Sequence, residues 1–82
     1  MEYGVVISPV YGKVESVSVQ NEARIYEWDA LFQIKGVNGS IQPIRTGVSG
    51  EIQSLEVQVG DRVIPGMVLA YIKEDLFVTG SD

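Results

Sequence analysis

Short apolar stretches alternate with polar residues along the whole chain, and no window keeps the periodicity of an amphipathic helix. Val and Ile are frequent in these stretches, while Gly, Asn and Pro interrupt them at short intervals. This pattern predicts an all-β fold of many short strands. In the first half we expect strands or short extended pieces at 4–7, from Gly12 onward, at 24–26 and at 30–34.

The middle of the chain carries the signature of a β-hairpin. Asn38 and Gly39 stand between the apolar residues Val37 and Ile41. Asn-Gly between apolar stretches is a strong hairpin signal, because both residues tolerate the positive φ of a type I′ turn. The sequence therefore predicts a type I′ hairpin with Asn38 and Gly39 at its tip.

The stretches on either side of this hairpin repeat each other. When the sequence is shifted by 38 positions, eight residues between 10 and 34 are identical to their counterparts. The pairs are Val10/Val48, Gly12/Gly50, Ser16/Ser54, Val19/Val57, Gln20/Gln58, Arg24/Arg62, Leu31/Leu69 and Ile34/Ile72. Both copies break strict alternation, after Val14 and after Ile52, which predicts a β-bulge in each. Such repetition predicts two similar β units packed face to face around an approximate two-fold axis.

The turns differ between the copies. The second copy has Gly60-Asp61 and Pro65-Gly66 where the first has Glu22-Ala23 and Glu27-Trp28. Pro65 presets φ and Gly66 accepts a positive φ, so a type II turn is expected there. Trp28 thus stands where its counterpart is Gly66. Together with Tyr26 it is a candidate contact patch for a protein partner. The alternative is that Trp28 folds over the sheet edge and caps the core.

The composition excludes several kinds of chemistry. The chain has 82 residues, which favours one domain with a thin core, and contains neither Cys nor His. Disulfides, Cys/His zinc sites, thiol catalysis and phosphohistidine transfer are therefore excluded. Ser16 and Ser54 have no histidine to activate them, and acids such as Glu27 and Asp29 are expected to be solvated. We therefore expect no enzyme activity, no catalytic residue and no metal site.

The charge balance bears on partners. The net charge is −5, with 11 acidic and 6 basic residues. The bases are spread along the sequence at Lys13, Arg24, Lys35, Arg45, Arg62 and Lys73. Because nucleic-acid binding needs a basic face, we do not expect a nucleic-acid partner. The N-terminal residues do not resemble a signal peptide, and no apolar run approaches the ~20 residues of a membrane span. A cytoplasmic protein without a membrane partner is expected.

Three segments resemble the biotinyl/lipoyl attachment, or carrier, domains. Residues 57–72 follow the pattern Val-x-x-Gly-Asp-x-Val-x-x-Gly-x-x-Leu-x-x-Ile, and residues 8–14 contain Pro-x-x-Gly-x-Val. Residues 44–52 are similar to the stretch after that family's central hairpin. The resemblance, which covers about residues 5–73, implies a barrel-sandwich hybrid, a flattened β-barrel of two four-stranded antiparallel sheets with quasi-two-fold symmetry. We expect this domain over 1–75. A tail over 76–82 is expected to form a short edge strand or to be partly disordered.

The chain departs from this family at the hairpin. Carrier domains present a lysine at the tip, and its amine takes biotin or lipoate as an amide. Counting residues from the matched segments on either side places that lysine at Asn38 or Gly39, and neither side chain has an amine. The nearest lysine is Lys35, on the strand before the tip. We therefore expect no cofactor, with biotin or lipoate on Lys35 as the alternative.

The resemblance and the missing lysine together imply a function. They predict a non-catalytic binding or scaffold module, similar to a biotin carboxyl carrier domain, without its own prosthetic group. One alternative is a genuine biotin or lipoyl carrier modified at Lys35. Another is a barrel-sandwich piece of a larger assembly. A protein partner is expected in the first and third cases.

Overall fold

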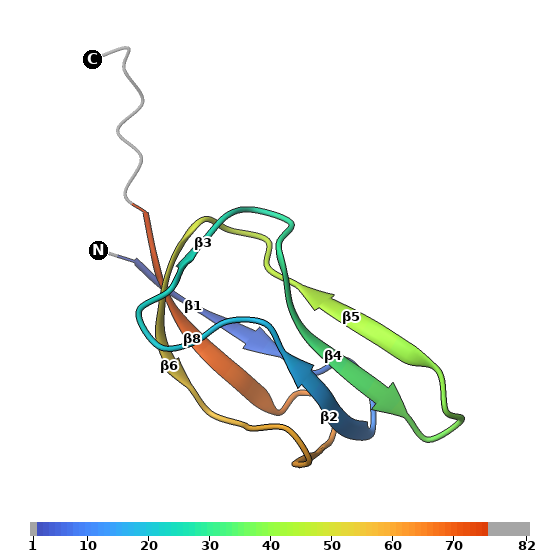
Figure 1. Ribbon diagram of the computed structural model, residues 1–82. Coiled ribbons are helices and arrows are strands. Elements are labelled where there is room, and N and C mark those ends of the chain that lie inside the picture. The colour runs from blue at the N-terminus through green and yellow to red at the C-terminus, as the bar shows by residue number, and fades with distance from the viewer. Residues whose placement is uncertain (1, 76–82) are drawn as a thin grey trace, which may run out of the picture.

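The computed structural model describes residues 2–75 and contains eight β-strands within that range (Figure 1). The strands are β1 (Glu2–Ile7), β2 (Gly12–Val17), β3 (Arg24–Ile25), β4 (Ala30–Gly36), β5 (Ile41–Arg45), β6 (Gly50–Leu55), β7 (Arg62–Val63) and β8 (Val68–Glu74). The all-β prediction is confirmed. The tail predicted at 76–82 lies outside the described residues.

The strands form two four-stranded antiparallel sheets, as expected for a barrel-sandwich. One sheet has the order β1-β8-β6-β3 and the other β5-β4-β2-β7. The start of β1 and the end of β8 lie together, at the opposite end of the molecule from the β4–β5 hairpin (Figure 1). Each short strand pairs across the copies: β3, from the first copy, pairs with β6 of the second, and β7 pairs with β2. The two copies are therefore interlocked rather than merely stacked.

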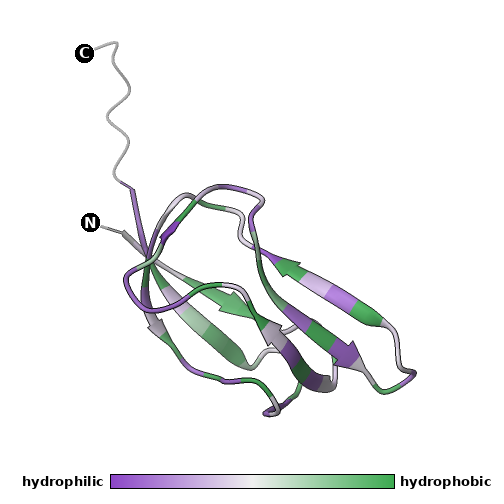
Figure 2. Ribbon diagram, viewed as in Figure 1, coloured by the Kyte–Doolittle hydropathy of each residue, from purple (hydrophilic) through white to green (hydrophobic). Residues whose placement is uncertain are grey.

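The core lies between the sheets, where apolar residues alternate with the polar residues of the outer faces (Figure 2). The buried apolar residues are Val6, Val14, Ile25, Leu31, Phe32, Ile34, Ile44, Ile52, Val57, Val63, Leu69, Ala70 and Ile72. Burying one such Val, Leu, Ile or Phe side chain contributes about 1.5–3 kcal/mol. Both copies supply these residues, so neither has a complete core alone.

The repeat found in the sequence is also present in the backbone hydrogen bonds. The N–H of Val14 donates to Asp61 O at 2.9 Å, and the N–H of Ile52, its counterpart, donates to Ala23 O at 2.9 Å. The register shifts between Val14 and Ser16 in β2, and between Ile52 and Ser54 in β6. These shifts confirm the two predicted bulges.

The structural repeat extends further than the sequence comparison, to β1 and β5. Ser8 and Thr46, 38 positions apart, follow these strands and are both buried. Each side-chain hydroxyl donates to the carbonyl oxygen two residues later, at 2.7 Å to Val10 and 2.9 Å to Val48. Each hydroxyl oxygen also accepts from the N–H of that same residue. Two buried polar groups are thus satisfied in the same way, as buried groups require.

Gly12 and Gly50 occupy equivalent places at the start of β2 and β6. A Cβ atom at Gly12 would collide with the carbonyl oxygen of Lys35, and one at Gly50 with that of Lys73. A glycine is therefore needed at both positions by the close approach of a neighbouring strand.

The turns before and after β3 and β7 place two residues of each copy at positive φ. In the 64–67 turn, Met67 N–H donates to Ile64 O at 3.0 Å and Gly66 has a φ of 87°, as the predicted type II turn requires. The equivalent turn in the first copy places Trp28 at a φ of 76°. Glu22, which corresponds to Gly60, also has a positive φ.

The predicted hairpin is present, but the prediction of a type I′ turn is wrong. A type I′ turn needs positive φ at both central residues, whereas Gly39 has a φ of 87° and Asn38 is not among the residues with positive φ. The N–H of Gly39 donates to Gly36 O at 2.9 Å, and the N–H of Gly36 donates to Ser40 O at 2.8 Å. The loop therefore has three residues, 37–39, with glycine alone in the left-handed region. The Asn38 side chain favours this form because its oxygen accepts from Ser40 N–H at 3.1 Å.

Candidate functional site

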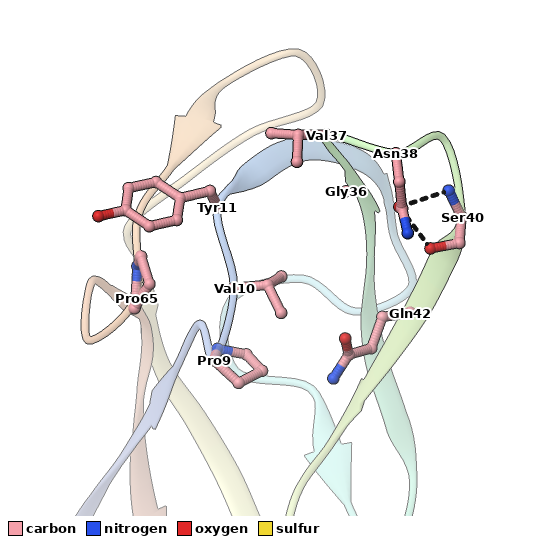
Figure 3. A pocket seen from close by; sticks show the side chains of 9 residues that line it. All are labelled: Pro9, Val10, Tyr11, Gly36, Val37, Asn38, Ser40, Gln42 and Pro65. Carbon is pink, nitrogen blue, oxygen red and sulfur yellow. Dashed lines mark hydrogen bonds between the residues drawn. The ribbon is translucent and has the colours of Figure 1, made fainter.

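A hollow of about 420 Å³ lies beside the hairpin tip, between the β1–β2 loop and the β4–β5 hairpin (Figure 3). It is lined by Pro9, Val10, Tyr11, Gly36, Val37, Asn38, Ser40, Gln42 and Pro65. The Asn38 oxygen accepts from both the backbone N–H and the hydroxyl of Ser40, which holds the tip against the start of β5 (Figure 3). The hollow combines an apolar lining with amide and hydroxyl groups, a composition suited to contacts rather than to proton transfer.

The structure places the predicted site residues of the hairpin as follows. Asn38 and Gly39 lie in the loop between β4 and β5, so the tip carries no amine. Lys35 lies on β4, opposite Ile41 of β5 and Lys13 of β2, and is exposed. It therefore projects from the outer face of a sheet and not from the turn.

A second hollow adjoins the first and was missed by sequence reasoning. It measures about 380 Å³ and is lined in part by Lys13, Lys35 and Arg62. These bases are far apart in the sequence but occupy directly opposed positions on β2, β4 and β7. The spread of basic residues along the sequence therefore hides a cluster in the fold. The pairing of β7 with β2 was the missing information.

The predicted contact residues Tyr26 and Trp28 lie in the β3–β4 turn, away from the hairpin tip. These residues are 61% and 66% exposed, so most of the Trp28 surface faces solvent. The Trp28 backbone is held firmly, since its N–H donates to Thr46 O at 2.8 Å and its carbonyl accepts from Arg45 Nη1 at 3.0 Å. A fixed backbone thus presents an aromatic side chain to solvent.

Arg24 joins this turn to the end of β8. Its guanidinium donates to both carboxylate oxygens of Asp75, at 2.9 and 2.8 Å, and lies 5.9 Å from the centre of the Tyr26 ring. The hydrogen bond with Asp75 raises the pKa of Arg24 above its ordinary value. This pair positions the Tyr26 side of the turn.

Asp29, one of the acids considered in the sequence, has a local structural role. Asp29 accepts from Tyr26 N–H at 2.8 Å, so its carboxylate stabilises the turn locally. Among residues 2–75, no group of three or more Asp or Glu side chains could hold a metal ion. In the same range, no helix is long and apolar enough to cross a membrane.

Several solved structures share this fold. The chain matches part of the urea carboxylase of Kluyveromyces lactis with a TM-score of 0.81 and 16% identity, covering 89% of this chain and 6% of that one. It matches part of a single-chain, multi-domain long-chain acyl-CoA carboxylase with a TM-score of 0.80 and 13% identity, covering 92% of this chain and 7% of that one.

A third match is to a protein of similar size, the lipoyl domain of the 2-oxoglutarate dehydrogenase complex from Azotobacter vinelandii. The TM-score is 0.73 at 15% identity, over 87% of this chain and 98% of the lipoyl domain. No protein-family profile and no curated protein sequence matches the chain. The fold is therefore the barrel-sandwich of biotinyl/lipoyl domains. Because the identities are 13–16%, these matches show the fold alone.

Proposed function

We propose that this chain is a biotinyl/lipoyl-like module that binds a protein partner in the cytoplasm and carries no prosthetic group at its hairpin. The proposed lack of a prosthetic group is supported by the residues at the hairpin tip. Asn38 and Gly39 occupy the loop where a carrier domain presents its lysine, and neither offers an amine for an amide bond. Without an attached group, a module of this fold acts through the surfaces that it presents.

The observation that supports a protein contact is the conformation of Trp28. A bulky residue at positive φ is a genuine outlier, because the left-handed region costs a non-glycine residue roughly 1–2 kcal/mol. Trp28 has a φ of 76° and is 66% exposed, so burial of its ring offsets little of that cost. The other copy has Gly66 at the equivalent position. A strained, exposed tryptophan is better explained by binding than by stability.

The matches to the carboxylases support a protein partner of some kind. In those chains a domain of this fold makes up 6% and 7% of the length. The fold therefore works beside other protein parts there, and we propose the same for this chain. A place as one piece of a larger assembly is compatible with this proposal.

The alternative is a genuine carrier modified at Lys35, and one observation favours it. Lys35 is exposed and is the lysine nearest the tip. Against it, a ligase would have to reach an amine on the outer face of a sheet, beside Lys13. Biotin or lipoate would be the attached group in this case.

Intact-mass measurement after co-expression with a biotin ligase and with a lipoate ligase separates the two. We expect no added mass on the wild type. The double variant Asn38→Lys/Gly39→Met is the positive control, and its labelling would show that the ligase accepts this domain. Added mass on the wild type that is lost in Lys35→Ala would overturn the proposal in favour of the carrier.

The protein contact is tested by affinity capture with Trp28→Gly. The equivalent turn of the second copy contains Gly66, so we expect this variant to keep the fold. We expect a partner captured by the wild type to be lost. Val59→Ala is the control, because Val59 is a similarly exposed apolar loop residue, at 63%, outside this turn. Equal capture by wild type and Trp28→Gly would contradict the proposed contact.

A further inference from the structure

Three basic side chains form a row across the outer face of the β5-β4-β2-β7 sheet. Lys13 on β2 lies directly opposite Lys35 on β4 and directly opposite Arg62 on β7. Directly opposed residues point to the same face, and neighbouring strands are about 4.8 Å apart. All three side chains are exposed. We call Arg62, Lys13 and Lys35 the basic row.

The bases of the basic row form no ion pair with the acids of the described residues. Within residues 2–75, the ion pairs join Arg24 to Glu51 and to Asp75, and none involves the basic row. Like charges directly opposite each other in a sheet are destabilising. The row is therefore a local cost, in a chain whose net charge is −5.

The equivalent row in the other sheet shows that the fold does not need this arrangement. There the 38-residue shift gives Arg24, Glu51 and Lys73, with the acid in the middle. Arg24 Nη2 lies 3.9 Å from Glu51 Oε2. One row contains an acid that pairs with a neighbouring base and the other contains bases only, which points to a role for the basic row outside the folded chain.

Apolar side chains border the basic row on the same surface. The hollow of about 380 Å³ that contains the three bases is also lined by Tyr11, Val37 and Ile64. These three are 63%, 90% and 56% exposed. The surface therefore offers positive charges beside accessible apolar area. We call these six residues together the basic groove.

We infer that the basic groove docks an acidic segment of a protein partner. Its carboxylates pair with the basic row, and its apolar side chains contact Tyr11, Val37 and Ile64. Arg62 can take a carboxylate with two hydrogen bonds, and the flexible lysines adapt to the spacing of the others. This surface is separate from the Trp28 turn, so the inference goes beyond the proposed function and does not depend on it.

Other anionic ligands fit the groove less well. A nucleic acid needs several phosphate contacts, and the acids elsewhere on this chain would repel the rest of its backbone. A single small anion needs donors that converge on one point, whereas these charges stand in a line on an open sheet. A line of charges with an apolar border matches a polypeptide that has several acidic residues and some apolar ones.

The test measures binding of a fluorescein-labelled peptide of repeated Glu-Glu-Leu to the whole chain at low salt, by fluorescence anisotropy. We expect saturable binding that weakens as salt is added, because exposed charges are screened. The same peptide with Gln in place of Glu is expected not to bind. No binding of the acidic peptide, or equal binding of the Gln peptide, would overturn the inference.

Variants locate the binding site. Lys35→Glu is expected to weaken binding about tenfold or more, because it replaces an attraction with a repulsion. Lys73→Glu is the matched control at the equivalent position of the other copy, with the same change in net charge. Its affinity should stay within about twofold of the wild type. Equal weakening by both variants would mean that overall charge, and not the groove, governs binding.

A labelled oligothymidine separates the polypeptide from a nucleic acid as the ligand. We expect it to bind more weakly than the acidic peptide under the same conditions. Tighter binding of the oligothymidine that is lost in Lys35→Glu would overturn the assignment to an acidic polypeptide.

Discussion

The two copies of the repeat agree inside the molecule and differ on its surface. Leu31 and Leu69 are both fully buried, and the equivalent residues Val14 and Ile52 are each 1% exposed. Backbone hydrogen bonds outside the regular strand pairing also recur at positions shifted by 38, as for Ser18 N–H to Leu31 O and Glu56 N–H to Leu69 O. Packing and hydrogen bonding therefore constrain both copies alike, because each contributes half of one core.

The outer faces have diverged. Lys13 stands where the other copy has Glu51, and Trp28 stands where it has Gly66. Both differences make the first copy less stable in itself, through like-charge neighbours in one case and a strained backbone in the other. The surface features of this molecule that call for a functional explanation therefore lie where one copy departs from the other at a cost in stability.

The largest effect should come from removing a constraint that both copies share. Gly12→Val and Gly50→Val each place a side chain against a backbone carbonyl of the neighbouring strand. We expect either variant to lose the roughly 3–5 kcal/mol that a core of this size supplies, and so to be unfolded. Circular dichroism checks this. A folded Gly50→Val protein beside an unfolded Gly12→Val would break the equivalence of the copies.

A smaller effect is expected where the copies differ in backbone strain. Trp28→Gly should raise the free energy of unfolding by about 0.5–1 kcal/mol, since glycine adopts positive φ without strain. Gly66→Ala should lower it by about 1 kcal/mol, because Gly66 has a φ of 87°. Urea denaturation measures both. A loss of stability in Trp28→Gly would show that the ring stabilises the fold, and would restore the capping role.

The smallest effect concerns the two charged rows. Lys13→Glu gives the basic row the same alternation as Arg24, Glu51 and Lys73, and should stabilise the domain by about 0.5 kcal/mol. Glu51→Lys should destabilise it by a similar amount. Melting temperatures at low and high salt test this, because the differences should shrink when charges are screened. Changes of the same sign in both variants would contradict the proposed contrast.

Much of the fold could be predicted from the sequence, and the exceptions have identifiable causes. The repeat, the bulges and the hairpin follow from local patterns, since alternation and turn residues act over a few positions. The type I′ turn was a wrong prediction because Asn-Gly permits two hairpin forms. The bonds from Ser40 to the Asn38 side chain favour the three-residue loop. Local sequence did not distinguish these forms.

The candidate sites divide in the same way. The absence of an amine at Asn38 and Gly39 can be read directly from the sequence. The same is true of the tryptophan at position 28, whose equivalent in the second copy is Gly66. That Trp28 is both strained and exposed could be established only from its backbone φ and its exposed fraction in the structure. The basic groove could not be predicted, because its bases are distant in the sequence and Arg62 reaches Lys13 only through the pairing of β7 with β2 across the copies.

The sequence by itself determined that this protein is two interdependent β units with no Cys or His chemistry, because periodicity, turn residues and composition are local properties of the chain. The tertiary structure alone decided which surfaces those units present. The exchange of β3 and β7 between the sheets brings Arg62 beside Lys13 and Arg24 beside Glu51. One exchange gathers like charges and the other pairs opposite ones, because strand pairing joins residues that are distant in the chain.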